Sequence, residues 1–409
     1  MYKTRHLEAK IKNLSQYAKV ILVVGARQVG KSTLLSHIFP DAPHITFDPF
    51  QDKYNVQADP DLFLQQYAKP LILDEIQYHP ALVSAIKRKV DQSPQPGQYF
   101  LTGSQNFSVL KNMAESMAGR VSILTLYPLT PHEMEGCPDK HWLPCLLESP
   151  PDLPRRFQGV LPIQLWSFLW RGRFPGMLSL PDDAIPIMLQ SYLETYIERD
   201  VRLLESIRDL NEFTRFVRIV AALTSQEIHP TQLGRDIGIT HTTASRWLNL
   251  LTYTYQWEEL CPYHGNTLKR LSRKGKGIFQ DTGMACHLLR LSSPEALGAY
   301  PQMGALFKTS VINQMTAVAT ALDMAPHKYH WRTSNGAEVD IILERDGWLY
   351  PIEVKAKTFV GKQDARGIRA FRETYPRQRI RPGVVIYAGD RCFWIDEQTL
   401  ALPYHAIIA

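Results

Sequence analysis

The chain has 409 residues, of which 44% are hydrophobic and 21% charged, and its formal net charge is +6. These proportions exclude a disordered chain, and the length predicts two to four domains. No apolar run approaches the roughly 20 residues of a membrane-spanning helix, and the polar residues 1–12 contain no signal-peptide core. Five scattered cysteines without a C-x-x-C pair favour a reducing compartment. We therefore expect a cytoplasmic protein that does not contact a membrane.

The first motif lies at residues 25–33, which read Gly-Ala-Arg-Gln-Val-Gly-Lys-Ser-Thr and follow the apolar run 20–24. This is a complete G-x-x-x-x-G-K-[ST] phosphate loop between a predicted strand and a predicted helix. The glycines let backbone N–H groups converge on phosphate, the lysine adds positive charge, and the serine hydroxyl binds Mg²⁺. The motif predicts binding of ATP and Mg²⁺ by Gly25, Gly30, Lys31, Ser32 and Thr33.

A second motif follows at the end of another apolar run, where residues 71–73 lead into Asp74 and Glu75. An acid at this strand end lies beside the phosphate loop, so Asp74 is predicted to hold Mg²⁺. Glu75 is predicted to orient or deprotonate the attacking water. The alternative interpretation is a strand that meets the N-cap of a helix.

Polar residues near two further strands extend the predicted site. Ser104, or alternatively Thr102, would contact the γ-phosphate or the water, although a plain strand-to-turn transition explains them equally well. Arg120 is a candidate to stabilise charge on the transferred phosphoryl group, in cis or across a homo-oligomer interface. The alternative is an exposed arginine that precedes a strand.

The first third of the chain alternates apolar strands with helical segments, which predicts an α/β fold with a mostly parallel sheet. Both faces of that sheet should be buried, because its strands are almost entirely apolar. The predicted strands are 20–24, 44–48, 71–73, 99–102 and 121–126.

These motifs resemble AAA-type ATPases of bacteria and archaea. The resemblance rests on the phosphate loop, Leu-Asp-Glu-Ile-Gln, Leu-Thr-Gly-Ser and Met-Ala-Gly-Arg-Val followed by Tyr-Pro-Leu-Thr-Pro-His-Glu, and it continues to the end of the chain. It implies a P-loop NTPase domain, a winged helix and a C-terminal domain similar to PD-(D/E)XK nucleases. The expected domains are residues 1–135 (ATPase), 136–225 (irregular excursion and helical connector), 226–292 (winged helix) and 293–409 (nuclease-like).

Within the connector, residues 141–162 are rich in proline and are expected to be irregular. Residues 165–170 and 187–204 have apolar positions at helical spacing and are predicted to be helices, with Ile187 among the buried positions.

Residues 231–251 fit a helix-turn-helix, in which Thr231 and Thr240 cap the two helices. The outward residues of the second helix are suited to base edges and phosphates. A protein-interaction or packing module is the alternative. The basic run 269–276 would act as a wing on the DNA backbone, or else as a solvated hairpin. The predicted DNA contacts here are Thr242, Thr243, Arg246, Lys269 and Arg270.

An Asp-Gly turn at 346–347 predicts a β-hairpin in the last domain. If Arg345 faces Trp348, then Asp340 lies opposite Glu353 and Glu338 opposite Lys355, all on one sheet face. Two facing carboxylates can share a divalent cation. The alternative is a Glu338–Lys355 salt bridge beside solvated acids, and Pro351 could shift the register through a bulge.

Asp340 followed by Glu353-Val-Lys355 is also the D…E-x-K pattern of PD-(D/E)XK nucleases, which implies an Mg²⁺-dependent nuclease site. The helix 303–321 departs from the family, because Lys308 stands where a further acid is expected, and a cation there disfavours metal.

Basic residues are concentrated just beyond the hairpin, with nine Lys or Arg against two Asp or Glu in residues 355–381. Lys362, Arg366 and Arg369 have helical spacing and are predicted to contact a DNA backbone. A solvated surface is the alternative.

Three functions fit the sequence. The first is an Mg²⁺-dependent ATPase that couples nucleotide state to DNA binding. The second is an ATP-gated DNA nuclease, and the third is an ATP-dependent switch that binds a protein partner.

Overall fold

The computed structural model describes residues 2–48, 56–104, 117–197, 201, 207, 209–265 and 275–409. The chain divides into two compact units, residues 1–129 with 253–255 and residues 130–252 with 256–409. Within the described residues, no helix has the length and apolar character needed to cross a membrane.

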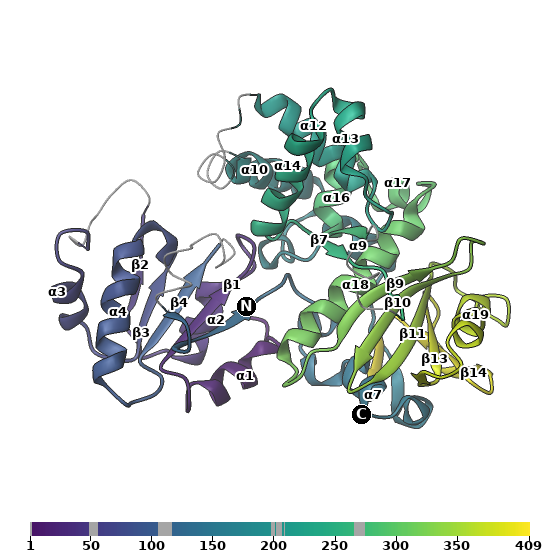
Figure 1. Cartoon of the computed structure of the whole chain (residues 1–409), viewed down its shortest axis with the longest axis horizontal. Helices are drawn as coiled ribbons and strands as arrows, with labels where there is room; N and C mark the ends of the chain where they lie inside the picture. The colour runs from purple at the N-terminus through teal and green to yellow at the C-terminus, as the bar shows by residue number, and fades with distance from the viewer. Residues whose placement is uncertain are drawn as a thin grey trace. The chain divides into compact units, whose positions relative to one another are not determined.

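The first unit is built on a five-stranded sheet with the order β2-β3-β4-β1-β5, in which every pair is parallel (Figure 1). This confirms the predicted parallel α/β sheet. All residues of the central strand β1 are buried, as expected when helices cover both sheet faces. Because the strands are parallel, the residues that follow them meet at one carboxyl edge. The strands are β1 (Val20–Val24), β2 (His44–Thr46), β3 (Leu71–Asp74), β4 (Tyr99–Gly103) and β5 (Val121–Thr125).

Among the described residues, four α-helices accompany this sheet. They are α1 (Leu7–Leu14), α2 (Lys31–Ile38), α3 (Pro60–Gln65) and α4 (Pro80–Gln92). In α4 the buried residues Leu82, Val83, Ile86 and Val90 recur at helical spacing, which turns one face toward the core.

Near the start of the second unit lie residues 141–162, which we expected to be irregular, and this expectation is wrong. The segment forms short helices and a strand that pairs antiparallel with β16 (Ala406–Ile408) at the C-terminus. The Trp142 indole also donates a hydrogen bond to the carbonyl of Tyr404, at 3.2 Å. Local proline content gave no hint of a partner some 250 residues away. The elements are α6 (Pro131–Met134), α7 (Trp142–Glu148), α8 (Leu153–Arg156) and β6 (Phe157–Val160).

A helical region follows, and it includes a two-stranded antiparallel sheet of β7 and β8. The predicted helix 165–170 is present, and the predicted helix 187–204 is present as far as Tyr196, whereas residues 198–200 and 202–206 lie outside the described residues. Ile187 is 67% exposed rather than buried. Thr231, which was expected to cap the first helix, lies inside it, because the helix begins at Pro230 with His229 at the N-cap position and no side-chain cap. The elements are α9 (Leu165–Arg171), α10 (Ile185–Tyr196), α12 (Leu210–Ala222), α13 (Pro230–Ile237), α14 (His241–Tyr253), β7 (Trp257–Leu260), β8 (Lys276–Phe279), α16 (Thr282–Leu288) and α17 (Pro294–Gly298).

The last part of the chain forms a mixed seven-stranded sheet in which β14-β15-β13-β11-β10-β9 are neighbours and β12 pairs with β11. Helix α18 lies against one face and α19 against the other (Figure 1). The elements are α18 (Met303–Ala321), β9 (His327–Arg332), β10 (Glu338–Arg345), β11 (Trp348–Lys355), α19 (Arg366–Thr374), β12 (Arg379–Ile380), β13 (Gly383–Tyr387), β14 (Phe393–Asp396) and β15 (Thr399–Pro403).

Candidate functional site

The phosphate loop connects the end of β1 to the start of α2, at the carboxyl edge of the parallel sheet. Gly25 has a φ of +147°, and a Cβ at this position would lie 2.2 Å from the carbonyl oxygen of Leu126. Only glycine fits so close to another backbone. The loop ends at Gly30, which is left-handed and directly precedes Lys31, the first residue of α2. The helix N-terminus therefore faces the space enclosed by the loop.

Two cationic side chains contact the phosphate loop. The Lys31 ammonium donates hydrogen bonds to the carbonyls of Gly25 and Ala26, at 3.0 and 2.9 Å. The buried Arg5 guanidinium donates to the carbonyl of Val29, at 2.8 Å. Sequence analysis missed Arg5, because no local pattern links the N-terminal segment to the loop.

Asp74 and Ser32 meet at the carboxyl edge, as the motifs predict. The Ser32 hydroxyl donates to Asp74 Oδ1 at 2.7 Å, and Thr102 donates to the same oxygen. Burial opposes ionisation of Asp74, but hydrogen bonds from His44, Thr102 and Ser32 leave its pKa lowered. An ionised carboxylate and a hydroxyl side by side are oxygen ligands that suit Mg²⁺, so these residues fit the metal.

Glu75 and Ser104 are joined by a residue that sequence analysis did not select. The Gln77 side-chain amide donates to the Glu75 carboxylate and to the Ser104 hydroxyl, the latter at 3.1 Å. The backbone N–H of Glu75 donates to Thr102 Oγ1 at 3.1 Å. Thr102 therefore links Asp74 to Glu75, whereas Ser104 lies one step further along this network.

Arg120 lies away from the phosphate loop of its own unit. It precedes β5, and β5 runs parallel to β1, so Arg120 is at the amino edge and the loop at the carboxyl edge. Its guanidinium pairs with both oxygens of Asp91, at 2.6 and 3.1 Å. The expectation that Arg120 acts in cis is therefore wrong. Action across a subunit interface stays a prediction.

In the second unit, the predicted hairpin has the predicted register. Arg345 pairs with Trp348 and Ile341 with Ile352, and Pro351 introduces no shift between β10 and β11. The register shift lies instead between β10 and β9. The hairpin lines a cavity of about 560 Å³ together with residues of α18 and α19. The charged residues of its wall include Lys308, Glu338, Asp340, Glu353, Lys355 and Arg366.

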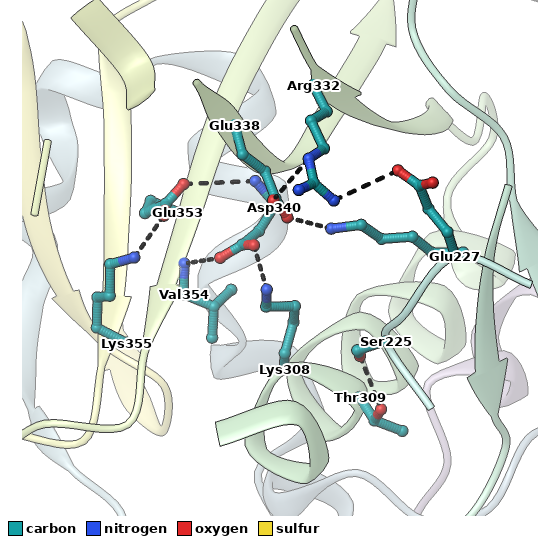
Figure 2. A network of polar contacts seen from close by, with 11 residues as sticks. Ser225, Glu227, Lys308, Thr309, Arg332, Glu338, Asp340, Glu353, Val354 and Lys355 are labelled. Carbon is teal, nitrogen blue, oxygen red and sulfur yellow. Dashed lines mark hydrogen bonds and ion pairs between the residues drawn. The ribbon is translucent and has the colours of Figure 1, made fainter. Parts of the chain in front are cut away.

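The carboxylates of Glu338, Asp340 and Glu353 each have a cationic partner (Figure 2). Lys308 contacts Asp340 Oδ1, while the backbone N–H of Val354 donates to the other oxygen at 2.9 Å. Lys355 pairs with Glu353 on its own strand at 2.5 Å, so the alternative of a Glu338–Lys355 salt bridge is wrong.

Glu338 is bound instead by residues from outside the hairpin. Lys276 on β8 contacts one of its oxygens, and Arg332 on β9 lies 3.9 Å from the other. Arg332 also pairs with Glu227 at 3.5 Å (Figure 2). This network joins the segment before α13 to the carboxylate cavity.

The electrostatics of the cavity oppose the predicted metal site. Burial would raise the pKa of Asp340, but Lys308 and Lys276 outweigh it and the pKa is lowered. Burial, reinforced by the Asp340 charge, raises the pKa of Glu353 to about 7. Lys308 keeps a raised pKa despite burial, because Asp340 stabilises its charge. The described residues contain no group of three or more His, Cys, Asp or Glu side chains arranged to hold a metal ion. The side chains present do not fit a divalent cation.

The predicted DNA contacts on α14 lie on its outward side. His241, Thr242 and Arg246 are exposed, whereas Trp247 and Leu251 are buried. Thr243 is half-buried, and its backbone N–H donates to the Thr240 hydroxyl at 3.1 Å, which confirms the predicted cap. Lys269 and Arg270 lie outside the described residues.

The predicted basic stripe near α19 is not one helical face. Lys362 precedes the helix, which begins at Arg366. Arg369 pairs with Asp396 at 3.2 Å and donates to the Lys362 carbonyl at 2.8 Å, so its charge is partly compensated. Arg366 lines the carboxylate cavity, whereas Lys362 and Arg369 line a separate opening.

Three family models match separate parts of the chain. Residues 17–135 match an AAA domain, residues 163–295 a domain of unknown function (DUF8612) and residues 303–407 another (DUF4143). The parallel sheet, the phosphate loop and the Asp74–Ser32 contact agree with the first match. The first unit thus has an AAA-type P-loop ATPase fold.

Nearly the whole chain is similar to two mycobacterial proteins. They are the uncharacterized protein Mb2031c of Mycobacterium bovis and the uncharacterized protein Rv2008c of Mycobacterium tuberculosis. Each is 26% identical over 407 residues, which cover 99% of this chain and 84% of the relative.

Two solved structures match this chain at low similarity. The Walker-type ATPase PABY2304 of Pyrococcus abyssi is 14% identical, with a TM-score of 0.39, over 71% of this chain and 98% of its own. The Thermotoga maritima RuvB Holliday junction branch migration motor is 14% identical, with a TM-score of 0.29, over 66% of this chain and 95% of its own.

Proposed function

We propose that this protein is an Mg²⁺-dependent ATPase that couples its nucleotide state to DNA binding by the second unit. The contact between the Ser32 hydroxyl and the Asp74 carboxylate carries the first part of the proposal. It brings two oxygen ligands together beside a loop whose lysine and helix N-terminus suit phosphate.

Each residue has a defined task in this proposal. Lys31 binds the β- and γ-phosphates, and Ser32 with Asp74 holds Mg²⁺, which neutralises phosphate charge when it is bound. Glu75 accepts a proton from the attacking water or orients it. Ser104 acts beside the γ-phosphate, from the end of the neighbouring strand β4.

The DNA-binding part rests on the arrangement of the helical region. Helices α13 and α14 followed by the β7–β8 pair support a winged-helix assignment for residues 226–292. The N-terminal turns of α14 present Thr242 and Arg246 outward, as a recognition helix does. Lys269 and Arg270 would follow as a wing on the DNA backbone.

For residues 293–409 we propose a nuclease-like fold that does not cleave DNA. The hairpin with Asp340, Glu353 and Lys355 on one face supports the fold assignment. The Lys308 ammonium on Asp340 argues against cleavage, because it already compensates the negative charge that would bind a divalent cation.

The ATPase proposal is tested by measuring hydrolysis in the wild type and in Lys31→Ala and Glu75→Gln. Turnover should fall by about 10²-fold or more in both variants, because they remove a phosphate contact and the base. Only Lys31→Ala should also weaken binding of a fluorescent ATP analogue. Equal turnover in all three proteins contradicts the proposal.

The DNA proposal is tested by filter binding at several salt concentrations, with and without ATP. We expect an affinity that falls with salt, changes with nucleotide and drops in Arg246→Ala. Asn249→Ala, on the exposed side of the same helix, serves as a matched control. Absence of nucleic-acid binding at low salt contradicts the proposal and favours a protein partner. Mg²⁺- or Mn²⁺-dependent cleavage that is lost in Asp340→Ala overturns the non-cleaving assignment.

A further inference from the structure

Gln77 lies between two residues of the proposed ATPase site. It sits in the short 3₁₀ helix Ile76–Tyr78, directly after Asp74 and Glu75, and its side chain is buried, with 8% of the residue exposed. Its Nε2 donates to the Glu75 carboxylate and to the Ser104 hydroxyl, the latter at 3.1 Å. One amide nitrogen thus connects the ends of β3 and β4.

The charge of Glu75 determines which way this amide points. An ionised carboxylate only accepts hydrogen bonds, so Nε2 rather than Oε1 must face Glu75. In this orientation Gln77 Oε1 is buried without a hydrogen-bond partner in the described structure. A buried acceptor without a partner is unfavourable, and the opposite orientation would set two acceptors against each other. The contact with Glu75 therefore determines the orientation of the Gln77 amide, and this orientation leaves Oε1 without a hydrogen bond in the described structure.

The backbone of Glu75 is constrained at the same point. Its φ is +59°, in the left-handed region that non-glycine residues rarely adopt, and its N–H donates to Thr102 at 3.1 Å. Non-glycine residues in this conformation persist where their surroundings hold them, and such positions cluster at functional sites. Thr102 holds the main chain of Glu75 and Gln77 holds its carboxylate.

We propose that Gln77 is a positioning residue of the ATPase, which holds the Glu75 carboxylate in place and couples it to Ser104. The inference rests on the proposed ATPase function. Gln77 acts on the group that handles the attacking water, and its hydrogen-bond partners Glu75 and Ser104 lie outside the phosphate loop. Its loss should therefore lower kcat and leave nucleotide affinity unchanged.

The test compares Gln77→Leu with wild type in steady-state hydrolysis and in binding of a fluorescent ATP analogue. Gln77→Leu keeps the size of the side chain and removes the donor. We expect kcat to fall on the order of 10²-fold, the cost of a misplaced catalytic group, with Kd within about twofold of wild type. Gln77→Asn keeps the amide on a shorter stem and should recover part of the loss.

Gln98→Leu is the matched control. Gln98 is also a buried glutamine of this unit, but it lies at the amino end of β4 and binds Lys69. Its kcat should remain close to wild type. If Gln98→Leu and Gln77→Leu lose activity equally, Gln77 has a merely structural role.

A double variant separates positioning from an independent contribution. If Gln77 acts through Glu75, then Gln77→Leu in a Glu75→Gln background should cost little more activity. Additive losses, or an unchanged kcat in Gln77→Leu, overturn the inference while leaving the ATPase proposal intact. Equal turnover in wild type and Lys31→Ala overturns the ATPase proposal itself.

Discussion

Lys308 on α18 contacts the carboxylate of Asp340 on β10, in the wall of the carboxylate cavity. The Asp340 side chain is 3% exposed and that of Lys308 20%, so the pair is largely removed from water. A buried carboxylate requires a compensating positive charge. Here the chain supplies that charge from a helix that precedes the hairpin, and Glu338 and Glu353 are compensated in the same way by Lys276 and Lys355.

We expect Lys308→Met to destabilise the second unit by about 3 kcal/mol, because it leaves Asp340 buried without its counter-charge. Lys308→Met combined with Asp340→Asn should recover most of this loss. Urea unfolding followed by tryptophan fluorescence isolates the effect, because all 8 tryptophans lie beyond residue 130. Lys357→Met removes an ion pair with Asp364 whose lysine side chain is 61% exposed, and it should change stability by no more than about 1 kcal/mol. Equal effects of the two lysine substitutions would contradict this account.

Replacing Lys308 by an acid should create the metal site that the wild type does not offer. Lys308→Glu brings a third carboxylate to Asp340 and Glu353, a ligand set that suits Mn²⁺. We expect saturable Mn²⁺ binding by electron paramagnetic resonance in this variant only. Both proteins should carry Asp74→Asn, so that the first unit does not contribute. Equally tight Mn²⁺ binding with Lys308 in place would show that this lysine does not prevent metal binding.

Gly25→Ala should abolish tight nucleotide binding. Its Cβ would meet the Leu126 carbonyl oxygen at 2.2 Å, and its φ of +147° is unfavourable for alanine. Gly119→Ala is the control, because Gly119 also has a positive φ, of +73°, but its Cβ would meet no atom within 4 Å. Titration with a fluorescent ATP analogue should separate the two variants, and similar affinities would mean that the close approach at Gly25 is unimportant.

The stability of the second unit should depend on pH through His405. Burial lowers the pKa of His405 from 6.5 to about 4. The folded state therefore binds fewer protons than the unfolded state between these values, and the free energy of unfolding falls as pH is lowered from 6.5 toward 4. Across this pH window, we expect the free energy of unfolding to fall by about 2 kcal/mol less in His405→Gln than in wild type. Urea unfolding at several pH values measures the difference. His327→Gln, at an exposed position, should follow the wild-type curve, and parallel curves for all three proteins would remove His405 as the cause.

The phosphate loop, the acidic strand end and the hairpin register could be predicted because each depends on residues close together in the chain. Residues 20–33 contain both the strand and the loop, and the turn at 346–347 determines which residues face each other. Prediction failed where the partner is distant. The prolines of residues 141–162 suggested an irregular segment, yet its strand pairs with the C-terminus.

The sequence by itself determined that this chain has a nucleotide-binding loop with an acid at a nearby strand end, because those patterns are local. Only the tertiary structure decided what neutralises each acidic side chain. Lys308 reaches Asp340 from α18, Lys276 reaches Glu338 from β8, and Gln77 connects Glu75 to Ser104 across two strands. Coulomb and hydrogen-bond interactions depend on distance in space, which spacing along the chain does not reveal. The carboxylates whose sequence pattern predicts a metal site therefore line a cavity in which lysines balance their charge.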